Sequence, residues 1–272
     1  MPELPEVETV VRDLLPMLVG RTIVRVRVGA KRLRRPWQRA WTAHLAGSHI
    51  RAIDRRGKWI VIDLGEPRLL VHLGMTGQFT VAQGPRESHT HLVFTLDDAG
   101  ELRFRDVRRF GSVTLYPDRA ALDAFFTQSA LGPEPFDVDA ASLHQSMRAS
   151  RRNLKAILLD QTVLAGVCNI YADESLFVAR LHPATLGTHV SRRQVESLRA
   201  AIVAVLSRAI DQRGSSIRDY IGGSGLQGAF QDEFRAYGRT GEPCVRCKTP
   251  IERITLAGRS THFCPRCQRK RA

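Results

Sequence analysis

The chain has 272 residues, a length that predicts two domains with a small additional module. Lys and Arg together number 41 against 27 Asp and Glu, and the formal net charge of +14 at pH 7 indicates a polyanionic partner. No run of about 18 apolar residues occurs, and the first six residues are acidic and rich in proline, so we expect neither a membrane span nor a secretory signal. Arginine supplies 36 of the 41 cations, which suits bidentate phosphate contacts, although a compositional bias of the genome would give the same excess.

The first half of the chain predicts a helix followed by a β-rich sandwich. Apolar residues recur at helical spacing between residues 5 and 18. Apolar segments of strand length then follow at residues 24–28, 59–62, 69–71, 92–96, 102–104 and 113–116. The sequence Asp97-Asp98-Ala99-Gly100 between two of these segments is typical of a hairpin turn. We therefore expect residues 1–130 to form a β-sandwich or barrel with a flanking helix.

The second half predicts helices and a terminal metal module, which makes the fold class α+β. The breaker-rich sequence Leu131-Gly132-Pro133-Glu134-Pro135 opens a predicted linker at residues 131–140. Helical spacing returns in a predicted helical domain at residues 141–235. Within that domain, the Gly- and Ser-rich segment 214–228 predicts a mobile loop. Residues 236–272 form the last predicted module.

Four cysteines near the C-terminus predict a zinc site. Cys244 and Cys247 form one CxxC pair, Cys264 and Cys267 form a second, and 16 residues separate the pairs. This spacing suits one structural Zn²⁺ held by four thiolates, which leave no open position for catalysis. Without a secretory signal we expect a cytoplasmic protein, whose thiols stay reduced.

The sequence between the two cysteine pairs alternates like a β-hairpin with a glycine turn, so we predict a zinc finger. The finger is either a structural clip or a carrier of cations for nucleic acid, and the surrounding cations favour the second interpretation. These cations are Arg253, Arg259, Arg266, Arg269, Lys270 and Arg271.

The N-terminus carries a candidate nucleophile. Removal of Met1 before the small residue Pro2 would leave a free secondary amine, and an α-amine titrates near about pH 8, well below a lysine. Such an amine can form a Schiff base with a sugar carbon. The neighbouring Glu3 and Glu6 suit acid catalysis and positioning, although carboxylates at this place also simply favour a helix N-terminus.

Several motifs taken in order resemble the bacterial formamidopyrimidine-DNA glycosylase family. They are the start Met1-Pro2-Glu3-Leu4-Pro5-Glu6, followed by Gly57-Lys58, His72-Leu73-Gly74-Met75-Thr76-Gly77, Arg108-Arg109-Phe110-Gly111, Leu131–Pro135, Asn169-Ile170-Tyr171-Ala172, Tyr237-Gly238-Arg239 and the cysteine pairs. The resemblance implies an N-terminal β-sandwich with a flanking helix, a helix–two-turn–helix domain and a β-hairpin zinc finger. It also implies a monomer that repairs double-stranded DNA containing an oxidised base or an abasic site.

The resemblance further implies a reaction and the residues that perform it. Pro2 attacks C1′ of the damaged nucleotide, the base leaves, and the imine undergoes β- and δ-elimination. Glu3 acts as the acid that opens the sugar, Glu6 holds the everted nucleotide, and Lys58 contacts the DNA backbone. Arg259 is counted among the catalytic residues and also matches a position that grips phosphate.

Eight further residues match the family's DNA contacts: His72, Met75, His91, Arg108, Phe110, Lys155, Asn169 and Tyr237. Met75, Arg108 and Phe110 would fill the space left by the everted base, as apolar wedges and a hydrogen-bond donor can. Core packing is the alternative for Met75 and Phe110, but the glycines beside both residues favour exposed turns. A half-buried structural role is the alternative for His72.

The sequence departs from the family at two places, and one competing function remains. Val107 stands where proline is usual, which predicts a less rigid loop. Cys168 stands where glycine is usual, and it would be strained if that position required positive φ. The competing hypothesis is a non-enzymatic zinc-ribbon protein that binds damaged DNA; it keeps the charge and the cysteines but needs no free N-terminus.

Overall fold

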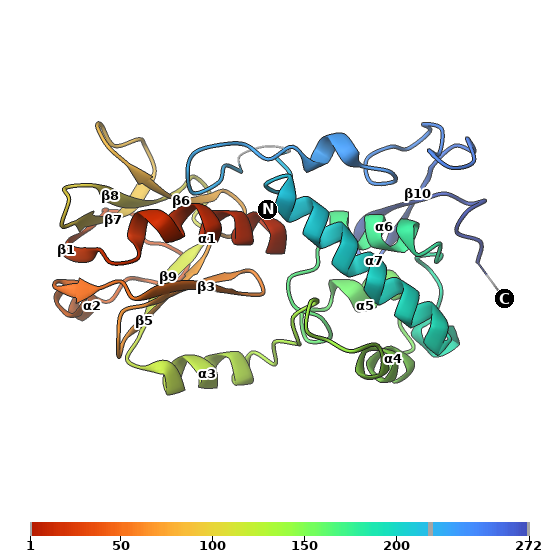
Figure 1. The fold of residues 1–272 in the computed structure, drawn as a ribbon, viewed down its shortest axis with the longest axis horizontal. Coiled ribbons are helices and arrows are strands. Elements are labelled where there is room, and N and C mark those ends of the chain that lie inside the picture. Colours follow the sequence, from red (N-terminus) through yellow and green to blue (C-terminus); the bar gives the residue numbers. More distant parts are fainter. Residues whose placement is uncertain (1, 217–219, 271–272) are drawn as a thin grey trace. The chain divides into compact units, whose positions relative to one another are not determined.

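The computed structural model describes residues 2–216 and 220–270 and divides the chain into two compact units (Figure 1). The first unit comprises Met1–Ser129 and Ile210–Gln231, and the second comprises Ala130–Ala209 and Asp232–Ala272. Residues 210–231 therefore group with the β-rich part of the chain, although all of them fall within the helical domain predicted at residues 141–235. Met1, Arg271 and residues 217–219 of the predicted loop lie outside the described residues.

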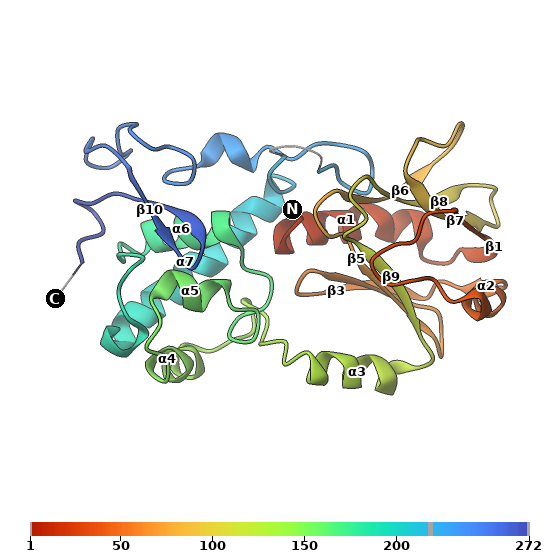
Figure 2. The same cartoon turned by 180° about the vertical axis from the view of Figure 1, so that it is seen from behind.

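Two antiparallel sheets form most of the first unit. The five-stranded sheet has the order β2-β1-β7-β8-β6, and the four-stranded sheet has the order β3-β4-β5-β9. Figure 2 shows β5 and β9 side by side, as their register requires. The strands are β1 (Thr22–Val28), β2 (Ser48–His49), β3 (Ala52–Arg56), β4 (Trp59–Asp63), β5 (Arg68–His72), β6 (Gly77–Ala82), β7 (Thr90–Leu96), β8 (Glu101–Asp106) and β9 (Ser112–Tyr116). The helices are α1 (Leu4–Leu18), α2 (Arg39–Leu45) and α3 (Arg119–Gln128).

Apolar burial joins α1 and both sheets into one core. The face of α1 that carries Val7, Val10 and Leu14 is buried, and each such side chain stabilises the fold by roughly 1.5–3 kcal/mol. Phe79 and Phe94 meet edge to face in the same core, with ring centroids 6.4 Å apart. The predicted sandwich with a flanking helix is therefore confirmed.

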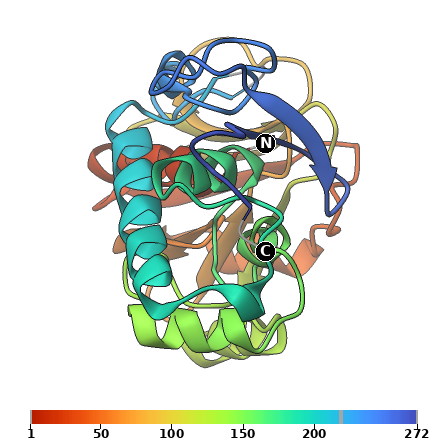
Figure 3. The same ribbon diagram turned by 90° about the vertical axis from the view of Figure 1, so that its right-hand side faces the viewer.

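Helices and a β-hairpin form the second unit. The helices are α4 (Ala140–Arg148), α5 (Leu154–Leu159), α6 (Asn169–Val178) and the long α7 (Arg192–Asp211), and the hairpin consists of β10 (Glu252–Leu256) and β11 (Arg259–Phe263). The last two residues of α7 belong to the first unit. Short 3₁₀ helices lie at Gly187–His189 and Phe230–Glu233. Figure 3 shows the dark blue hairpin and the cyan helix α7 with the green helices of this unit.

The hairpin turn between β10 and β11 consists of Ala257 and Gly258, both with positive φ, which matches a type I′ turn. The predicted hairpin between the cysteine pairs is therefore confirmed. None of the helices in the described ranges combines the length and the apolar character required to cross a lipid bilayer.

Candidate active site and nucleic-acid interface

The chain start is fixed by a reciprocal pair of carboxylates at the N-terminus of α1. Pro2 and Glu3 are both buried in the residues immediately before this helix. The Glu3 backbone N–H donates to Glu6 Oε2 at 2.9 Å, as part of a capping box between the two residues. Glu6 Oε1 accepts the backbone N–H of Ser215 at 2.7 Å. Glu6 therefore links Glu3, the residue next to the predicted nucleophile Pro2, to the segment around Ser215, which lies more than 200 residues away in the sequence.

Glu3 is a buried acid in contact with a lysine. Its carboxylate pairs with Lys58 Nζ, which lies at the turn between β3 and β4. Burial raises the pKa of Glu3 to about 7, even though Lys58 opposes the shift, and the neighbouring Glu6 adds to it. A carboxyl group with this pKa is available as a proton donor near neutral pH, as the predicted acid requires.

The described part of the predicted loop is held against α1. Asp13 accepts hydrogen bonds from both terminal nitrogens of Arg213, at 3.0 and 2.6 Å, and from the backbone N–H of Ser224 at 3.1 Å. The Tyr220 hydroxyl donates to the Glu6 carbonyl at 3.1 Å. Gly214, at φ +79°, must lack a Cβ, because that atom would lie 2.8 Å from the Glu6 side chain. Ser215, Tyr220 and Ser224 of the loop thus all bond to α1, the helix that begins two residues after the predicted nucleophile Pro2.

Two neighbouring loops present the three predicted wedge residues to solvent. Met75 is 37% exposed and Phe110 is 44% exposed, which contradicts the core-packing alternative for both. The Arg108 guanidinium lies 4.7 Å from the centre of the Phe110 ring. These exposed side chains follow β5 and β8, on residues 73–77 and 107–111.

Asp106, which no sequence motif predicted as a functional residue, joins these two loops. Its carboxylate is fully buried and accepts hydrogen bonds from the Thr76 hydroxyl at 2.6 Å and from the backbone N–H of Gly111 at 2.8 Å. The Arg108 backbone N–H adds a third bond at 3.2 Å. An aspartate at the end of a strand that also contains Glu101 and two arginines gives no sequence signal, since only the fold shows that Asp106 is buried.

Glycine is required where the two loops touch. Gly74 has φ +63°, and a Cβ there would lie 2.5 Å from the backbone nitrogen of Gly111. A Cβ on Gly111 would lie 2.7 Å from the His72 carbonyl oxygen. The glycines beside Met75 and Phe110 therefore permit a backbone-to-backbone contact that fixes both loops.

His72 is a neutral hydrogen-bond donor. Burial lowers the pKa of His72 to about 4, and the nearby cations Lys58, Arg34 and Arg35 lower it further. Its Nδ1 accepts the Gly74 backbone N–H at 3.2 Å, which leaves the ring proton on Nε2. The ring is half buried, so a phosphate contact and a structural contact are both compatible with its place.

His91 does not fit the direct DNA contact predicted for it. The side chain is buried, and its Nε2 donates to the Asp106 carbonyl at 2.9 Å. Because this ring nitrogen bonds to the backbone of Asp106, His91 supports the loops at residues 73–77 and 107–111 and does not face a ligand. The sequence around His91 gave no indication that the side chain is buried.

Lys155 also requires a correction. Its side chain is fully buried, and Nζ donates to Asp173 Oδ1 at 2.5 Å and to the Asn169 carbonyl at 2.7 Å. Asp173 Oδ2 in turn accepts the backbone N–H of His262 at 2.9 Å. Lys155 therefore supports the first turn of α6 and, through Asp173, the strand β11, and it presents no charge to a phosphate.

The other residues predicted for this part of the interface are half buried or exposed. Asn169 begins α6, and its Nδ2 donates to the Ser260 carbonyl at 2.9 Å. The N–H groups of Tyr237 and its two predecessors donate to the buried Glu174. Arg259 is exposed beside the hairpin turn. Adjacent acids on α6 thus anchor the segments carrying Tyr237 and Arg259.

Cys168 is not strained. It precedes α6 with φ −123°, in the extended region that any residue adopts. The substitution of cysteine for the family's usual glycine therefore leaves the backbone before Asn169 undisturbed. Val107 is 45% exposed, in the loop that Asp106 anchors.

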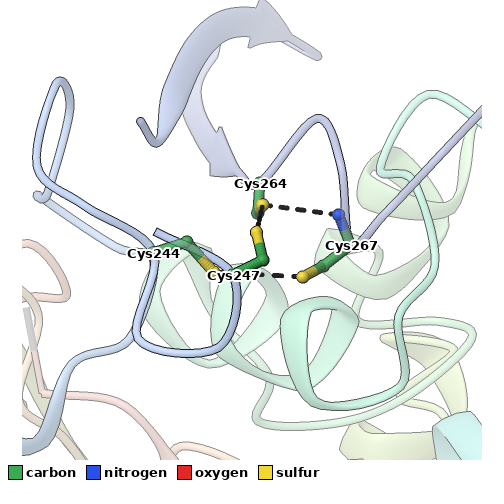
Figure 4. A group of neighbouring side chains, drawn as sticks. All are labelled: Cys244, Cys247, Cys264 and Cys267. Carbon is green, nitrogen blue, oxygen red and sulfur yellow. Dashed lines mark hydrogen bonds between the residues drawn. The ribbon is translucent and has the colours of Figure 1, made fainter. Parts of the chain in front are cut away.

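The four terminal cysteines form a site for one zinc ion. Figure 4 shows their sulfur atoms turned toward one another, and all four lie within 4.8 Å of each other. The Sγ atoms of Cys247 and Cys264 are 3.4 Å apart, and those of Cys244 and Cys267 are 4.0 Å apart. Tetrahedral Zn²⁺ with Zn–S bonds of about 2.3 Å needs sulfur atoms about 3.8 Å apart, so the donor set fits the ion in number, chemistry and spacing.

Comparison with known proteins finds relatives that match nearly the whole chain. Family models match residues 1–113 (formamidopyrimidine-DNA glycosylase N-terminal domain), residues 131–220 (formamidopyrimidine-DNA glycosylase H2TH domain) and residues 241–269 (zinc finger found in FPG and IleRS). The formamidopyrimidine-DNA glycosylase of Geobacillus kaustophilus is 45% identical over 99% of this chain and 100% of its own length. The chain belongs to the formamidopyrimidine-DNA glycosylase family. The relative from Chloroflexus aurantiacus is 46% identical over 98% of both chains.

Solved structures of formamidopyrimidine-DNA glycosylases resemble this fold closely. A Lactococcus lactis FPG mutant in complex with DNA containing Fapy-dG is 38% identical, covers 99% of this chain and 100% of its own, and has a TM-score of 0.91. The L. lactis Fpg complex with abasic-site DNA matches with the same TM-score and identity, over 98% and 100% of the two chains.

Family membership decides between the two functions that the sequence left open. The protein is an enzyme, a DNA glycosylase of base-excision repair, and the non-enzymatic hypothesis is wrong. The zinc-finger match and the cysteine cluster confirm the predicted structural zinc site. Within the first unit, the structure brings Glu3, Glu6 and Lys58 together beside Pro2.

Proposed function

We propose that this glycosylase excises oxidised purines, 8-oxoguanine and formamidopyrimidines, from double-stranded DNA and then cleaves the abasic site as a lyase. The observation that carries the proposal is the buried Glu3 carboxyl, adjacent to Pro2 and paired with Lys58. The Lactococcus lactis relative, which matches nearly the whole chain, supports the substrate, because it has been solved with Fapy-dG-containing DNA and with abasic-site DNA.

Pro2 is the proposed nucleophile, and it acts only after Met1 has been removed. The neutral amine nitrogen forms a bond to C1′, and the bond from C1′ to the base breaks with its electron pair leaving on the base. The nitrogen gives up its proton, which balances the proton that the departing base takes up, and its lone pair then forms the iminium ion as the C1′–O4′ bond breaks and O4′ is protonated. Loss of a proton from C2′ then expels the 3′ phosphate, and a second elimination expels the 5′ phosphate.

Three residues around Pro2 have proposed supporting roles. Glu3 gives its proton to O4′ as the sugar opens, which its pKa of about 7 permits near neutral pH. Lys58 stabilises the resulting Glu3 carboxylate and contacts the DNA backbone near the lesion. Glu6 holds the chain start and residue 215 in one arrangement, and through them the everted nucleotide.

The exposed loops supply the proposed DNA contacts. Met75 and Phe110 enter the stack where the damaged base has left, and Arg108 bonds to the orphaned base. His72, Asn169, Tyr237 and Arg259 contact phosphates, as their matched motifs imply, whereas His91 and Lys155 are buried and bonded within the fold. We place the enzyme in the bacterial cytoplasm, bound to the nucleoid as a monomer.

Borohydride trapping on an 8-oxoguanine duplex tests the chemistry. Protein whose intact mass shows removal of Met1 should give a covalent adduct with DNA, because borohydride reduces the iminium ion to a stable amine. Protein that retains Met1 should give none, since its proline nitrogen is part of a peptide bond.

Two variants separate the chemistry from binding. Glu3→Gln should lose strand cleavage while retaining affinity for an abasic-analogue duplex, and Pro2→Gly, which replaces the secondary amine by a primary one, should cleave more slowly at the same affinity. Active protein that retains Met1, or wild-type cleavage by both variants, would contradict the proposal.

A further inference from the structure

The second unit contains a cationic cavity that the proposed repair reaction does not use. The cavity has a volume of about 570 Å³ and lies beyond the C-terminal end of α6. α6 has ten residues, so its two ends are separated by roughly 14 Å, and the proposed phosphate contact of Asn169 lies at the opposite end. The volume falls within the range of about 300–1,000 Å³ that is typical of ligand sites.

The lining of the cavity is strongly cationic. Arg180, Arg193 and Arg269 contribute guanidinium groups, and the described residues that line it include no carboxylate. Across residues 2–216 and 220–270, none of these three arginines makes an ion pair, whereas Arg192, the neighbour of Arg193, pairs with Glu196 at 3.3 Å. Guanidinium groups without carboxylate partners suit a phosphate, whose oxygens accept several N–H bonds at once.

The walls of the cavity are fixed by buried contacts. Gln268 is fully buried, donates from Nε2 to the Leu181 carbonyl at 2.9 Å and accepts the Cys264 backbone N–H at 2.8 Å. These bonds hold the segment before Arg269 against the segment after Arg180. The cationic groups are therefore carried by a defined backbone, which lowers the cost of ordering them around a ligand.

Arg180 occupies a position that usually belongs to glycine. It follows the C-terminus of α6 with φ +56°, and the Leu181 backbone N–H donates to the Leu176 carbonyl at 3.0 Å, as in a glycine-terminated helix. An arginine at this position adopts a positive φ that is unfavourable for a residue with a Cβ, and its guanidinium group lines the cavity. The guanidinium of Arg246 lies near enough to Arg180 for the two charges to interact.

We propose that this cavity is a second phosphate-binding site, separate from the proposed lesion-binding residues. The phosphate belongs either to a free nucleotide or to the backbone of a second DNA segment. A site of the second kind would let the enzyme hold one duplex at its catalytic residues while it contacts another.

The test uses full-length protein saturated with a short duplex that contains a tetrahydrofuran abasic analogue. One arm titrates dAMP by calorimetry, and the other titrates a fluorescent undamaged duplex at low salt by anisotropy. The matched variants are Arg193→Ala, which removes a lining cation, and Arg192→Ala, which removes the same charge from the adjacent position outside the cavity.

We expect Arg193→Ala to weaken the second binding event about tenfold, as loss of a charge-assisted hydrogen bond implies, and Arg192→Ala to change it less than twofold. Binding of dAMP alone identifies a nucleotide site, and binding of the undamaged duplex identifies a site for DNA backbone. Absence of any second binding event, or equal weakening by the two variants, overturns the proposal. Single-turnover excision should be unchanged in Arg193→Ala, so a failure of the proposed function would show separately, as loss of excision by wild-type protein.

Discussion

Replacement of Asp106 by asparagine should loosen both loops that carry the proposed DNA wedge. One Asp106 oxygen accepts the Thr76 hydroxyl and the Arg108 N–H, and the other accepts the Gly111 N–H. Asparagine keeps one acceptor oxygen and replaces the other with an NH₂ donor. That NH₂ group would then face either the Arg108 N–H or the Gly111 N–H, which are donors themselves. Loss of a hydrogen bond to a buried charge costs about 1.5–3 kcal/mol, and we expect a loss of about 2–3 kcal/mol in the free energy of unfolding.

Thermal unfolding followed by circular dichroism measures this loss. At about 2–4 °C per kcal/mol for a unit of this size, Tm should fall by about 5–10 °C. The glycosylase step should suffer more than the lyase step, because an intact base must be everted and its space filled, whereas an abasic site has no base to evict. We expect excision of 8-oxoguanine to fall at least about tenfold while cleavage of a preformed abasic site changes little.

Asp98→Asn is the matched control for the Asp106 variant. Asp98 is a partly exposed aspartate in the β7–β8 turn that accepts the Gly100 N–H at 2.9 Å and pairs with Arg21 at 3.1 Å. Its replacement should cost less than about 1 kcal/mol and leave excision unchanged. Equal effects of the two variants on Tm and on excision would refute the role assigned to the buried carboxylate.

Four further outcomes follow from the structure. Burial raises the pKa of Glu3 from 4.5 to about 7. The contribution of the protonated Glu3 carboxyl to the free energy of unfolding is therefore complete below pH 4.5 and is lost as pH rises through about 7. In urea titrations, the free energy of unfolding of the wild type relative to Glu3→Gln should fall by up to about 3 kcal/mol between these pH values. Gly74→Ala should lower Tm and excision sharply, whereas Gly84→Ala, also at positive φ but with open space around it, should cost about 1 kcal/mol. Lys155→Met should destabilise the protein by about 3–5 kcal/mol, measured in urea, and adding Asp173→Asn should recover part of that loss. Removal of zinc by a chelator should lower both Tm and affinity for abasic-analogue DNA, with metal content followed by atomic emission.

Periodicity predicted the elements whose burial is regular. The helix at residues 5–18 and the strands at 59–62 and 69–71 match α1, β4 and β5 to within one residue at every end. The short, mostly exposed helix α2 buries only Leu45 among its residues, so its sequence carries no apolar stripe to reveal it. Strand β6 was missed for a related reason, because its buried and half-buried residues include Gly77 and Thr80.

Motif order predicted which residues belong near the site but not how each is used. Met75 and Phe110 were predicted as wedges, and adjacent glycines marked them correctly as exposed. His91 and Lys155 carry the same chemical types as surface DNA contacts, yet both are buried and bonded within the fold. The residue type alone cannot separate these cases, since burial depends on the tertiary packing of segments distant in sequence.

The buried acids explain how so cationic a chain can hold its exposed groups in place. Asp106, Asp173 and Glu174 are all buried, and each accepts hydrogen bonds from at least two groups on segments that carry a proposed DNA contact. A buried carboxylate is costly to desolvate, and burial raises the pKa of Glu174 despite its three N–H donors. Hydrogen bonds from the N–H and O–H groups of the neighbouring segments offset that desolvation cost. If one of these segments moved away, it would leave a buried carboxylate without hydrogen-bond donors, which is unfavourable. The same acids that never meet DNA therefore stabilise the loop conformations on which the proposed DNA contacts depend.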